Sequence, residues 1–159
     1  QDYVNATVGN KPIQQLAKPF AAVATRLEDG ERSVFVRGNT GQAVRASSSV
    51  PGVFEPVTIG KWHYVDGGVV SPVPVDAVRE LGADLVIAVD ISDKPRGQKT
   101  GSLVGTMGQS LAIMGQKLGQ AVSLQDVGIL VHFLCGRYDN SHSILLFLCQ
   151  AEKRACCGL

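Results

Sequence analysis

Cysteine is missing from the first 134 residues of this 159-residue chain, and all four cysteines fall at positions 135, 149, 156 and 157. No two have the Cys-x-x-Cys spacing of zinc sites, and no histidine stands at a ligand-like offset from two of them. A disulfide scaffold would distribute its cysteines through the fold. We therefore expect neither a metal site nor a disulfide framework, and we interpret the adjacent Cys156 and Cys157 as free thiols.

Charge of one sign and long apolar runs are also scarce. The net charge is +1 and Lys and Arg are spread along the chain, whereas nucleic-acid-binding proteins carry a clustered basic face. The longest apolar runs are far shorter than the 18 or more residues of a membrane-spanning helix, and no signal peptide is visible. We expect no nucleic-acid partner, and a cytoplasmic protein or one peripheral to a membrane. Because the first residue is Gln and its segment resembles the middle of a fold, we also expect further residues upstream.

What the sequence does contain is a globular composition, 45% hydrophobic and 18% charged, with enough length for one domain with a core. Apolar patterns and turn residues predict the elements. Strands are expected over residues 19–25, 33–37, 57–59, 62–65, 85–89 and 127–134, and helices over residues 42–48, 74–81 and 102–123. The order strand, helix, strand across residues 62–89 predicts a parallel unit with covering layers, and hence an α/β fold.

The predicted helix over residues 102–123 begins at a capping serine, Ser102. Its apolar residues recur at spacings of three and four, so they share one face. That face comprises Leu103, Met107, Leu111, Met114, Leu118 and Val122. Glycine weakens a helix interior, so the glycines of this helix need another reason to be there. We expect that they allow close approach to a sheet. These are Gly105, Gly108, Gly115 and Gly119.

Residues 62–75, WHYVDGGVVSPVPV, are the stretch around which the chain is organised. An apolar strand ends in Asp66-Gly67-Gly68, and Pro74 is well suited to the first position of a helix. By itself, Asp-Gly between apolar runs is typical of a plain hairpin turn. The alternative is that the strand presents the Asp66 carboxylate at its end, and the flanking sequence favours this alternative.

An ordered series of motifs surrounds Asp66. It comprises Arg45-Ala46-Ser47, Pro51-Gly52, Phe54, Pro56-Val57, Asp66-Gly67-Gly68, Pro72, Pro74-Val75 and Gly82-Ala83-Asp84. With PFAAVAT (residues 19–25) and GNTGQAVRAS (residues 38–47), the series resembles the C-terminal half of patatin-like phospholipases, in particular the small stand-alone bacterial members. The resemblance covers residues 1–124. It implies a three-layer α/β/α sheet that is incomplete on its N-terminal side.

The resemblance also implies a serine lipid acyl hydrolase with a Ser–Asp dyad, in which Asp66 is the general base. In this family the serine lies in a Gly-x-Ser-x-Gly turn and a separate glycine-rich loop supplies the oxyanion hole. This chain contains neither. The implied substrate is a fatty-acyl ester or phospholipid, and no cofactor or metal is implied. The residues expected to shape the site, beside the motif Asp66, Gly67 and Gly68, are Pro51, Gly52, Phe54, Ser71, Pro72 and Pro74.

The residue types fit that chemistry. A serine hydroxyl becomes a strong nucleophile when a positioned base takes its proton. A carboxylate can serve if it is within hydrogen-bond reach and partly desolvated. Asp66 follows an apolar strand, so its carboxylate can project from the end of a sheet. Gly67 and Gly68 leave room for a neighbouring backbone and an acyl chain, and Pro72 and Pro74 stiffen the exit.

Other serines fit the role of nucleophile poorly. Gly108-Gln109-Ser110-Leu111-Ala112 is the nearest match to the elbow, but it lacks the final glycine and lies within a helix, where the strained strand-to-helix turn cannot form. Residues 47–49 are serines close to the loop but outside any elbow. His63 lies three residues before Asp66, so on a strand it faces the other way.

Three further features have alternative interpretations. Asp90 ends a predicted strand and would suit the edge of a site, although a loop or cap role is favoured. Arg45 would bind a lipid phosphate or, as we favour, pair with an acid. Residues 38–41 form a glycine-containing loop before a helix, but they lack the spacing of known phosphate-binding loops.

The resemblance has departures. Arg26 stands where the family often has Asp, and Ser71 stands where close relatives often have Asn. Residues 125–159 differ from the usual ending of the family, as a change of reading frame would produce, and we assign them no function. Two interpretations stay open: part of an enzyme, or an inactive truncated fragment that acts, if at all, as a lipid- or partner-binding module. An incomplete sheet would expose an apolar edge, so we expect self-association.

Overall fold

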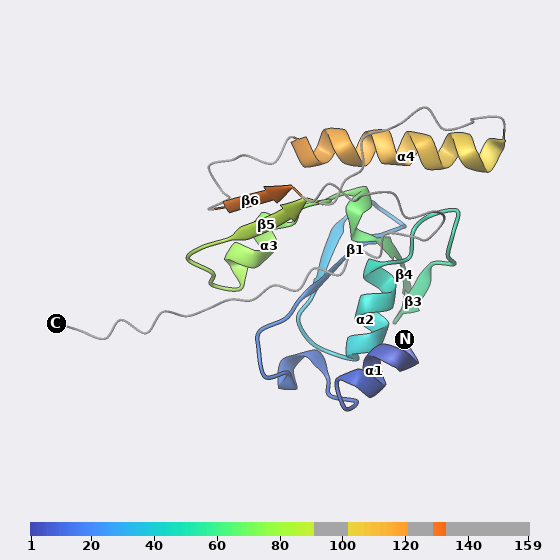
Figure 1. The fold of residues 1–159 in the computed structure, drawn as a ribbon. Helices are drawn as coiled ribbons and strands as arrows, with labels where there is room; N and C mark the ends of the chain where they lie inside the picture. The colour runs from blue at the N-terminus through green and yellow to red at the C-terminus, as the bar shows by residue number, and fades with distance from the viewer. Residues whose placement is uncertain (91–101, 121–128, 133–159) are drawn as a thin grey trace.

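The computed structural model describes residues 1–90, 102–120 and 129–132 (Figure 1). It has the mixed α/β character that the sequence predicts. The helices are α1 (Asp2–Thr7), α2 (Thr40–Ser47), α3 (Val75–Glu80) and α4 (Leu103–Gln120), with short 3-10 turns η1 (Ile13–Gln15) and η2 (Gly67–Val69). The strands are β1 (Ala22–Arg26), β2 (Arg32–Phe35), β3 (Val57–Ile59), β4 (Trp62–Asp66), β5 (Ile87–Asp90) and β6 (Ile129–His132).

Four antiparallel strands in the order β2-β1-β4-β3 form the main sheet. Two hairpins are formed, since β1 pairs with β2 and β3 pairs with β4. Gly30 and Gly60 occupy the two hairpin turns with φ of 73° and 64°, a region of backbone space that glycine enters without steric cost. β4 also pairs with β1, with Ala24 opposite Asp66. The main sheet therefore carries Asp66 at the end of a central strand, with α2 in contact with β1 and β4 (Figure 1).

The strand after α3 pairs differently from the prediction. β5 forms a parallel pair with β6, with Ile87 opposite Ile129, and the described strands include no ladder between β4 and β5. An apolar run indicates that a strand is buried but does not select its neighbour. The six-residue α3 follows η2, where the chain has already left the main sheet.

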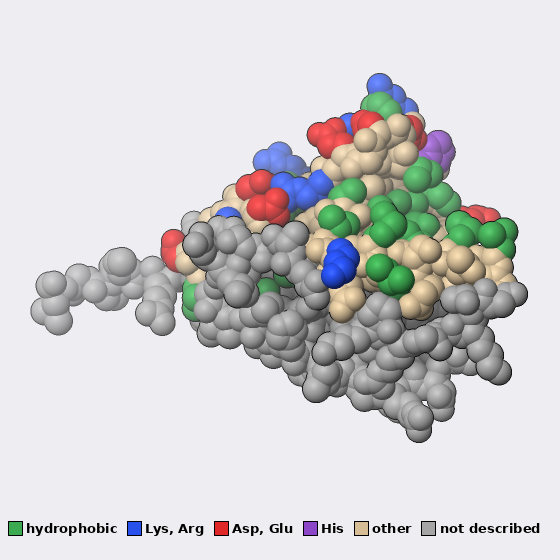
Figure 2. All heavy atoms as spheres, turned by 90° about the horizontal axis from the view of Figure 1, so that it is seen from above, with side chains coloured by type: hydrophobic (Ala, Val, Ile, Leu, Met, Phe, Trp, Pro, Cys, Tyr) green, Lys and Arg blue, Asp and Glu red, His purple; other side chains and the backbone are tan. Residues whose placement is uncertain are grey.

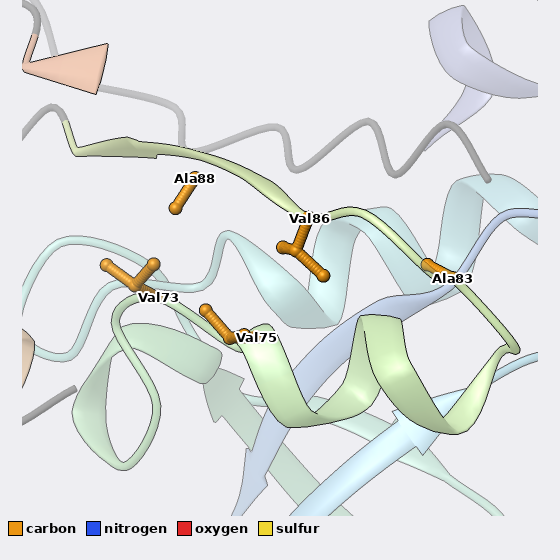
Figure 3. Packing of buried hydrophobic residues seen from close by; sticks show 5 residues of the cluster. All are labelled: Val73, Val75, Ala83, Val86 and Ala88. Atoms are coloured by element: carbon orange, nitrogen blue, oxygen red, sulfur yellow. The ribbon is translucent and has the colours of Figure 1, made fainter. Parts of the chain in front are cut away.

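Small apolar side chains pack between α3 and β5. Val73, in the loop before α3, and Val75, the first residue of α3, face Val86 and Ala88 (Figure 3). A second cluster lies between α2 and the main sheet and contains Ala24, Ala46, Val57 and Tyr64, with Phe35 packed edge-on against Tyr64 at 5.0 Å between ring centroids. Burial of these apolar groups is the main favourable term for the fold.

A short N-terminal helix, α1, was not expected from the sequence, and it packs against α2. The Gly41 N–H donates to Asn5 Oδ1 at 2.8 Å, and a Cβ on Gly41 would overlap the Gln1 carbonyl oxygen and the Asn5 side chain. Asn39 caps α2 by accepting from the Gln42 N–H. α1 therefore packs against the glycine-containing loop over residues 38–41.

α4 begins close to the predicted residue, and Ser102 Oγ accepts from the Gly105 N–H at 3.1 Å, which confirms the cap. Most of its described large apolar side chains, however, are exposed. Leu103 is 78% exposed and Met114 is 57% exposed, and Figure 2, which looks onto α4, shows hydrophobic side chains across this face. The expected close approach at Gly108 and Gly115 is wrong, because a Cβ there would have no atom within 4 Å. Periodicity predicts an apolar face but not what covers it; Val122 lies outside the described residues.

Replacement by alanine should change the free energy of unfolding in opposite directions at two glycines. Gly82 follows α3 with φ of 89°, where an L-residue is strained, so Gly82→Ala should lower the free energy of unfolding by about 1 kcal/mol. Gly108 has helical geometry and open space around it, so Gly108→Ala should raise that free energy by roughly 0.5–1 kcal/mol. Denaturant unfolding of both variants tests this, and a change of the same sign in both would contradict it.

The chain's single tryptophan, Trp62, is the first residue of β4 and packs, partly buried, against the cluster that contains Tyr64. The Arg26 guanidinium lies 4.6 Å from the centroid of the Trp62 ring, and the Lys61 ammonium lies 4.7 Å from it. Arg26 also forms an ion pair with Asp29 at 2.6 Å and another with Glu31. Arg26, one of the departures from the family pattern, is thus a structural residue that links a hairpin turn to β4.

Candidate active site

Asp66 is the last residue of β4 and the residue before η2. Its Oδ1 accepts the Gly68 N–H at 2.7 Å, so the carboxylate caps the 3-10 turn. The chain then continues into α3. Residues 66–68, which we call the DGG turn, therefore present a carboxylate at a strand end, and the plain hairpin interpretation is wrong.

Two buried residues hold the backbone of Asp66. Its N–H donates to the Ser49 carbonyl oxygen at 2.9 Å, and its own carbonyl oxygen accepts from the Thr25 hydroxyl at 2.8 Å. Thr25 is 3% exposed and Ser49 is 1% exposed. Both polar backbone groups of Asp66 are thus satisfied where the β1–β4 ladder ends, as buried groups must be.

The glycines of the DGG turn have different reasons to be glycine. A Cβ on Gly67 would overlap the Val23 carbonyl oxygen, whereas a Cβ on Gly68 would lie 3.0 Å from Asp66 Oδ1. The expected room for a neighbouring backbone is therefore present at Gly67, and that backbone belongs to β1. Room for an acyl chain stays a prediction.

Burial raises the pKa of the Asp66 carboxyl above its ordinary value, and the hydrogen bond from the Gly68 N–H partly offsets the shift. Removal of water disfavours the charged form. The result is a more basic carboxylate than one on the open surface, which is the property a general base needs.

The hydroxyls of three other candidate nucleophiles donate to backbone carbonyls. The Ser48 and Ser49 hydroxyls donate to the α2 carbonyls of Val44 and Arg45, each at 2.8 Å. Ser110 lies in α4 and donates to the Thr106 carbonyl at 2.9 Å.

Charged and metal-binding candidates give a similar result. His63 Nδ1 lies 2.7 Å from Glu28 Oε1 on the surface. No carboxylate among the described residues pairs with Arg45, so the favoured ion pair is absent there. Asp90 ends β5, and its side chain lies outside the described part. Within residues 1–90, 102–120 and 129–132, no cluster of three or more His, Cys, Asp or Glu would hold a metal ion.

Residues 1–79, which include the DGG turn and both of its backbone anchors, match the family profile described as patatin-like phospholipase. Residues 1–79 of this chain belong to the patatin-like phospholipase family. The four-stranded sheet with its helices is a partial form of the patatin-like α/β/α fold. The prediction of this fold class is confirmed.

Curated relatives are longer than this chain. An uncharacterized NTE family protein of Mycobacterium tuberculosis is 38% identical over 96 residues, which cover 60% of this chain and 27% of that protein. A second such protein of M. tuberculosis is 34% identical over 88 residues, covering 55% of this chain and 15% of its own length. Patatin-like phospholipase domain-containing protein 7 of Mus musculus is 30% identical over 96 residues, covering 57% and 7%. The chain therefore spans only a small part of these relatives.

The remaining patatin-like motif residues lie before and after the DGG turn. The loop that follows Ser49 contains Pro51, Gly52 with φ of 81°, and Phe54, which is 43% exposed. On the other side, the Ser71 N–H donates to the Gly67 carbonyl at 2.9 Å. This bond uses the backbone, so the change from the family's frequent Asn leaves it intact.

The two prolines lie between the DGG turn and α3. Pro72 is partly buried, and the buried Pro74 is the N-cap of α3, one position before the predicted one. The structure thus connects the predicted site-shaping residues to Asp66 through Ser49 and Gly67. Their roles toward a substrate stay predictions.

Two residues that hold Asp66 are not evident as such from the sequence. Thr25 belongs to the PFAAVAT stretch, where it is the one hydroxyl in an apolar run. Ser49 is a candidate nucleophile by its residue type, whereas its backbone carbonyl is the group that contacts Asp66. The hydroxyl in an otherwise apolar strand is the signal by which Thr25 could have been found.

The raised pKa of Asp66 predicts a pH dependence of stability. The folded state holds the carboxyl proton more tightly than the unfolded state, whose pKa is near the ordinary 3.8. Stability from this group is therefore complete below the unfolded-state pKa and is lost as pH rises through the folded-state pKa. Asp66→Asn lacks this loss, so the variant should gain stability relative to wild type as pH rises from about 3 toward 7. Urea unfolding across that range tests it; a relative gain for wild type would contradict it.

Proposed function

We propose that this chain is the aspartate-bearing part of a serine lipid acyl hydrolase, with Asp66 as the general base of a Ser–Asp dyad. The observation that carries the proposal is the desolvated Asp66 carboxylate, fixed at the end of β4 within the region that matches the family. The attacking serine would come from outside these 159 residues, since no Gly-x-Ser-x-Gly occurs among them.

The carboxylate geometry supports this role. Among the described residues, the Gly68 N–H donates to the carboxylate, and it reaches Oδ1. Oδ2 is then the oxygen that accepts the serine proton. The serine attacks the carbonyl of a fatty-acyl ester, the alcohol leaves with the proton, and water hydrolyses the acyl-enzyme with Asp66 again as the base. The proposed reaction uses no metal and no cofactor.

The substrate we propose is a fatty-acyl ester or phospholipid. Val53 is 49% exposed and Phe54 is 43% exposed in the loop after Ser49, and these apolar groups would face an acyl chain. Pro51, Gly52, Ser71, Pro72 and Pro74 would form the rest of the wall.

Peripheral contact with a membrane and self-association are further parts of the proposal. Among the described helices, none combines the length and the apolar character needed to cross a lipid bilayer. The outward apolar residues of α4 support association.

We also propose that the family domain ends near residue 124 and that residues 125–159 are a separate tail, most of which lies outside the described part.

The second candidate function is an inactive binding module, favoured by the missing Gly-x-Ser-x-Gly turn. A graft distinguishes the two. The matched region of this chain, with Asp66, replaces the corresponding region of the M. tuberculosis relative that is 38% identical. Hydrolysis of a p-nitrophenyl fatty-acyl ester and labelling by a fluorophosphonate are then compared with the unmodified relative.

For the proposed enzyme, the folded graft hydrolyses the ester and is labelled at a serine of the relative, while the isolated chain is not labelled. A folded but inert graft beside an active relative would favour the binding module. Labelling of the isolated chain, followed by peptide mapping, would show that a serine within these 159 residues is the nucleophile and would overturn the proposed division of the dyad.

A further inference from the structure

We propose that Thr25 is a positioning residue for Asp66: its hydroxyl fixes the Asp66 carbonyl and, through it, the direction of the carboxylate. This inference rests on the proposed role of Asp66 as the base. It goes further by naming the group outside the DGG turn that holds the base in place.

The contact joins β1 to the site across the sheet. Thr25 pairs with Val65 in the β1–β4 register, and its Oγ1 reaches the carbonyl oxygen of the next residue, Asp66, at 2.8 Å. Thr25 is 3% exposed, so its hydroxyl has little access to water, and the bond to the Asp66 carbonyl is partly buried. Removing the donor would leave a partly buried acceptor without this hydrogen bond, which is costly.

The Asp66 carbonyl is linked to the hydrogen bond that caps the carboxylate, because rotation about the ψ angle of Asp66 moves both that carbonyl and the Gly68 N–H. The Asp66 carbonyl and the Gly67 N–H belong to the same rigid peptide plane, which turns about the ψ angle of Asp66. Rotation of this plane would also move the Gly68 N–H away from Oδ1, which it now contacts at 2.7 Å. The Thr25 hydroxyl therefore holds the plane in the orientation that keeps the carboxylate capped.

Ser49 does not share this role through its side chain. It is the Ser49 carbonyl that accepts the Asp66 N–H, and the Ser49 hydroxyl donates to Arg45 within α2. The bond to the Ser49 carbonyl restrains the peptide plane before the Asp66 Cα. It therefore does not restrain the ψ angle of Asp66. The side chain of Thr25 is thus the anchor that a substitution can remove.

Thr40 offers a matched control. It is 2% exposed and its hydroxyl donates to the Lys11 carbonyl at 2.7 Å. The two threonines therefore make the same kind of buried side-chain to backbone bond. Thr40 lies at the start of α2 and its bond leads to the N-terminal segment, so Thr40→Val should lower stability without acting on the DGG turn.

The experiment compares Thr25→Val, Thr25→Ser and Thr40→Val in the full chain, by NMR. We expect Thr25→Val to speed hydrogen exchange of the Gly68 amide by about tenfold beyond the change due to global stability, the scale of one lost hydrogen bond. Thr25→Ser should restore it, and Thr40→Val should leave it unchanged. Equal effects of Thr25→Val and Thr40→Val on Gly68 would overturn the proposal, as would an unrestored Thr25→Ser. If Thr25→Val does not fold, Thr25→Ala takes its place in the comparison.

The graft separates this inference from the proposed function. If both hold, Asp66→Asn abolishes hydrolysis, and Thr25→Val lowers kcat at least several-fold with little change in KM. Loss with Asp66→Asn but an unchanged kcat with Thr25→Val would overturn the positioning role alone. Full activity of Asp66→Asn would overturn the proposed base, whatever the exchange of Gly68 shows.

Discussion

Gly67→Ala should lower the free energy of unfolding by about 3 kcal/mol, the upper range for inserting atoms into a packed site. An added Cβ would overlap the Val23 carbonyl oxygen, which belongs to the backbone of β1 and cannot turn aside as a side chain would. Relief requires the DGG turn to move away from β1. That movement would stretch the bond between the Thr25 hydroxyl and the Asp66 carbonyl.

Gly68→Ala is the matched control for that result. Its Cβ would meet Asp66 Oδ1 at 3.0 Å, and a carboxylate on a rotatable side chain can give way by a few tenths of an ångström. We expect a loss below about 1 kcal/mol, the range of ordinary surface and semi-exposed substitutions. Denaturant unfolding of the two variants decides the point, and losses of equal size would show that the contact with β1 does not restrict position 67.

In the graft onto the M. tuberculosis relative, Asp66→Asn should lower kcat by about 10²–10⁴-fold, the usual contribution of a general base. Asparagine keeps the shape of the side chain, and its amide oxygen can still accept the Gly68 N–H. It cannot take up the serine proton at neutral pH. The variant should therefore bind substrate with a similar KM and fail in the chemical step.

Asp29→Asn is the control for the activity loss, because Asp29 lies in the β1–β2 turn and pairs with Arg26 on the surface. We expect it to keep full activity. Stopped-time assays with the p-nitrophenyl ester, at pH values above the pKa of Asp66, provide the measurement. A tenfold or smaller effect of Asp66→Asn would leave the carboxylate without a role as base.

Local chemistry made the turns between strands and the start of α4 predictable. Gly30 and Gly60 mark turns whose backbone requires positive φ, and Ser102 satisfies a free N–H at the start of α4. Such signals act over a few residues, so they are legible in one sequence. The position of Asp66 at the end of a strand followed from the same kind of signal.

Contacts between distant segments were not predictable in this way. The Thr25 hydroxyl reaches a carbonyl 41 residues away, and β5 pairs with β6 across a long gap in the chain. α4 shows that a regular apolar face can be predicted correctly while its surroundings are misjudged. α1 is six residues long without a buried side chain, so its sequence carries little apolar pattern to detect.

The fluorescence of Trp62 depends on the contacts that surround its ring. Because the chain has a single tryptophan, its fluorescence arises at one place, where the Arg26 and Lys61 cations lie 4.6 and 4.7 Å from the centroid of the indole at the start of β4. Cations held close to an indole ring alter its emission wavelength and intensity, so separation of β1 from β4 will change the spectrum. Emission from Trp62 will therefore report the integrity of the strand that ends in Asp66, without any added label.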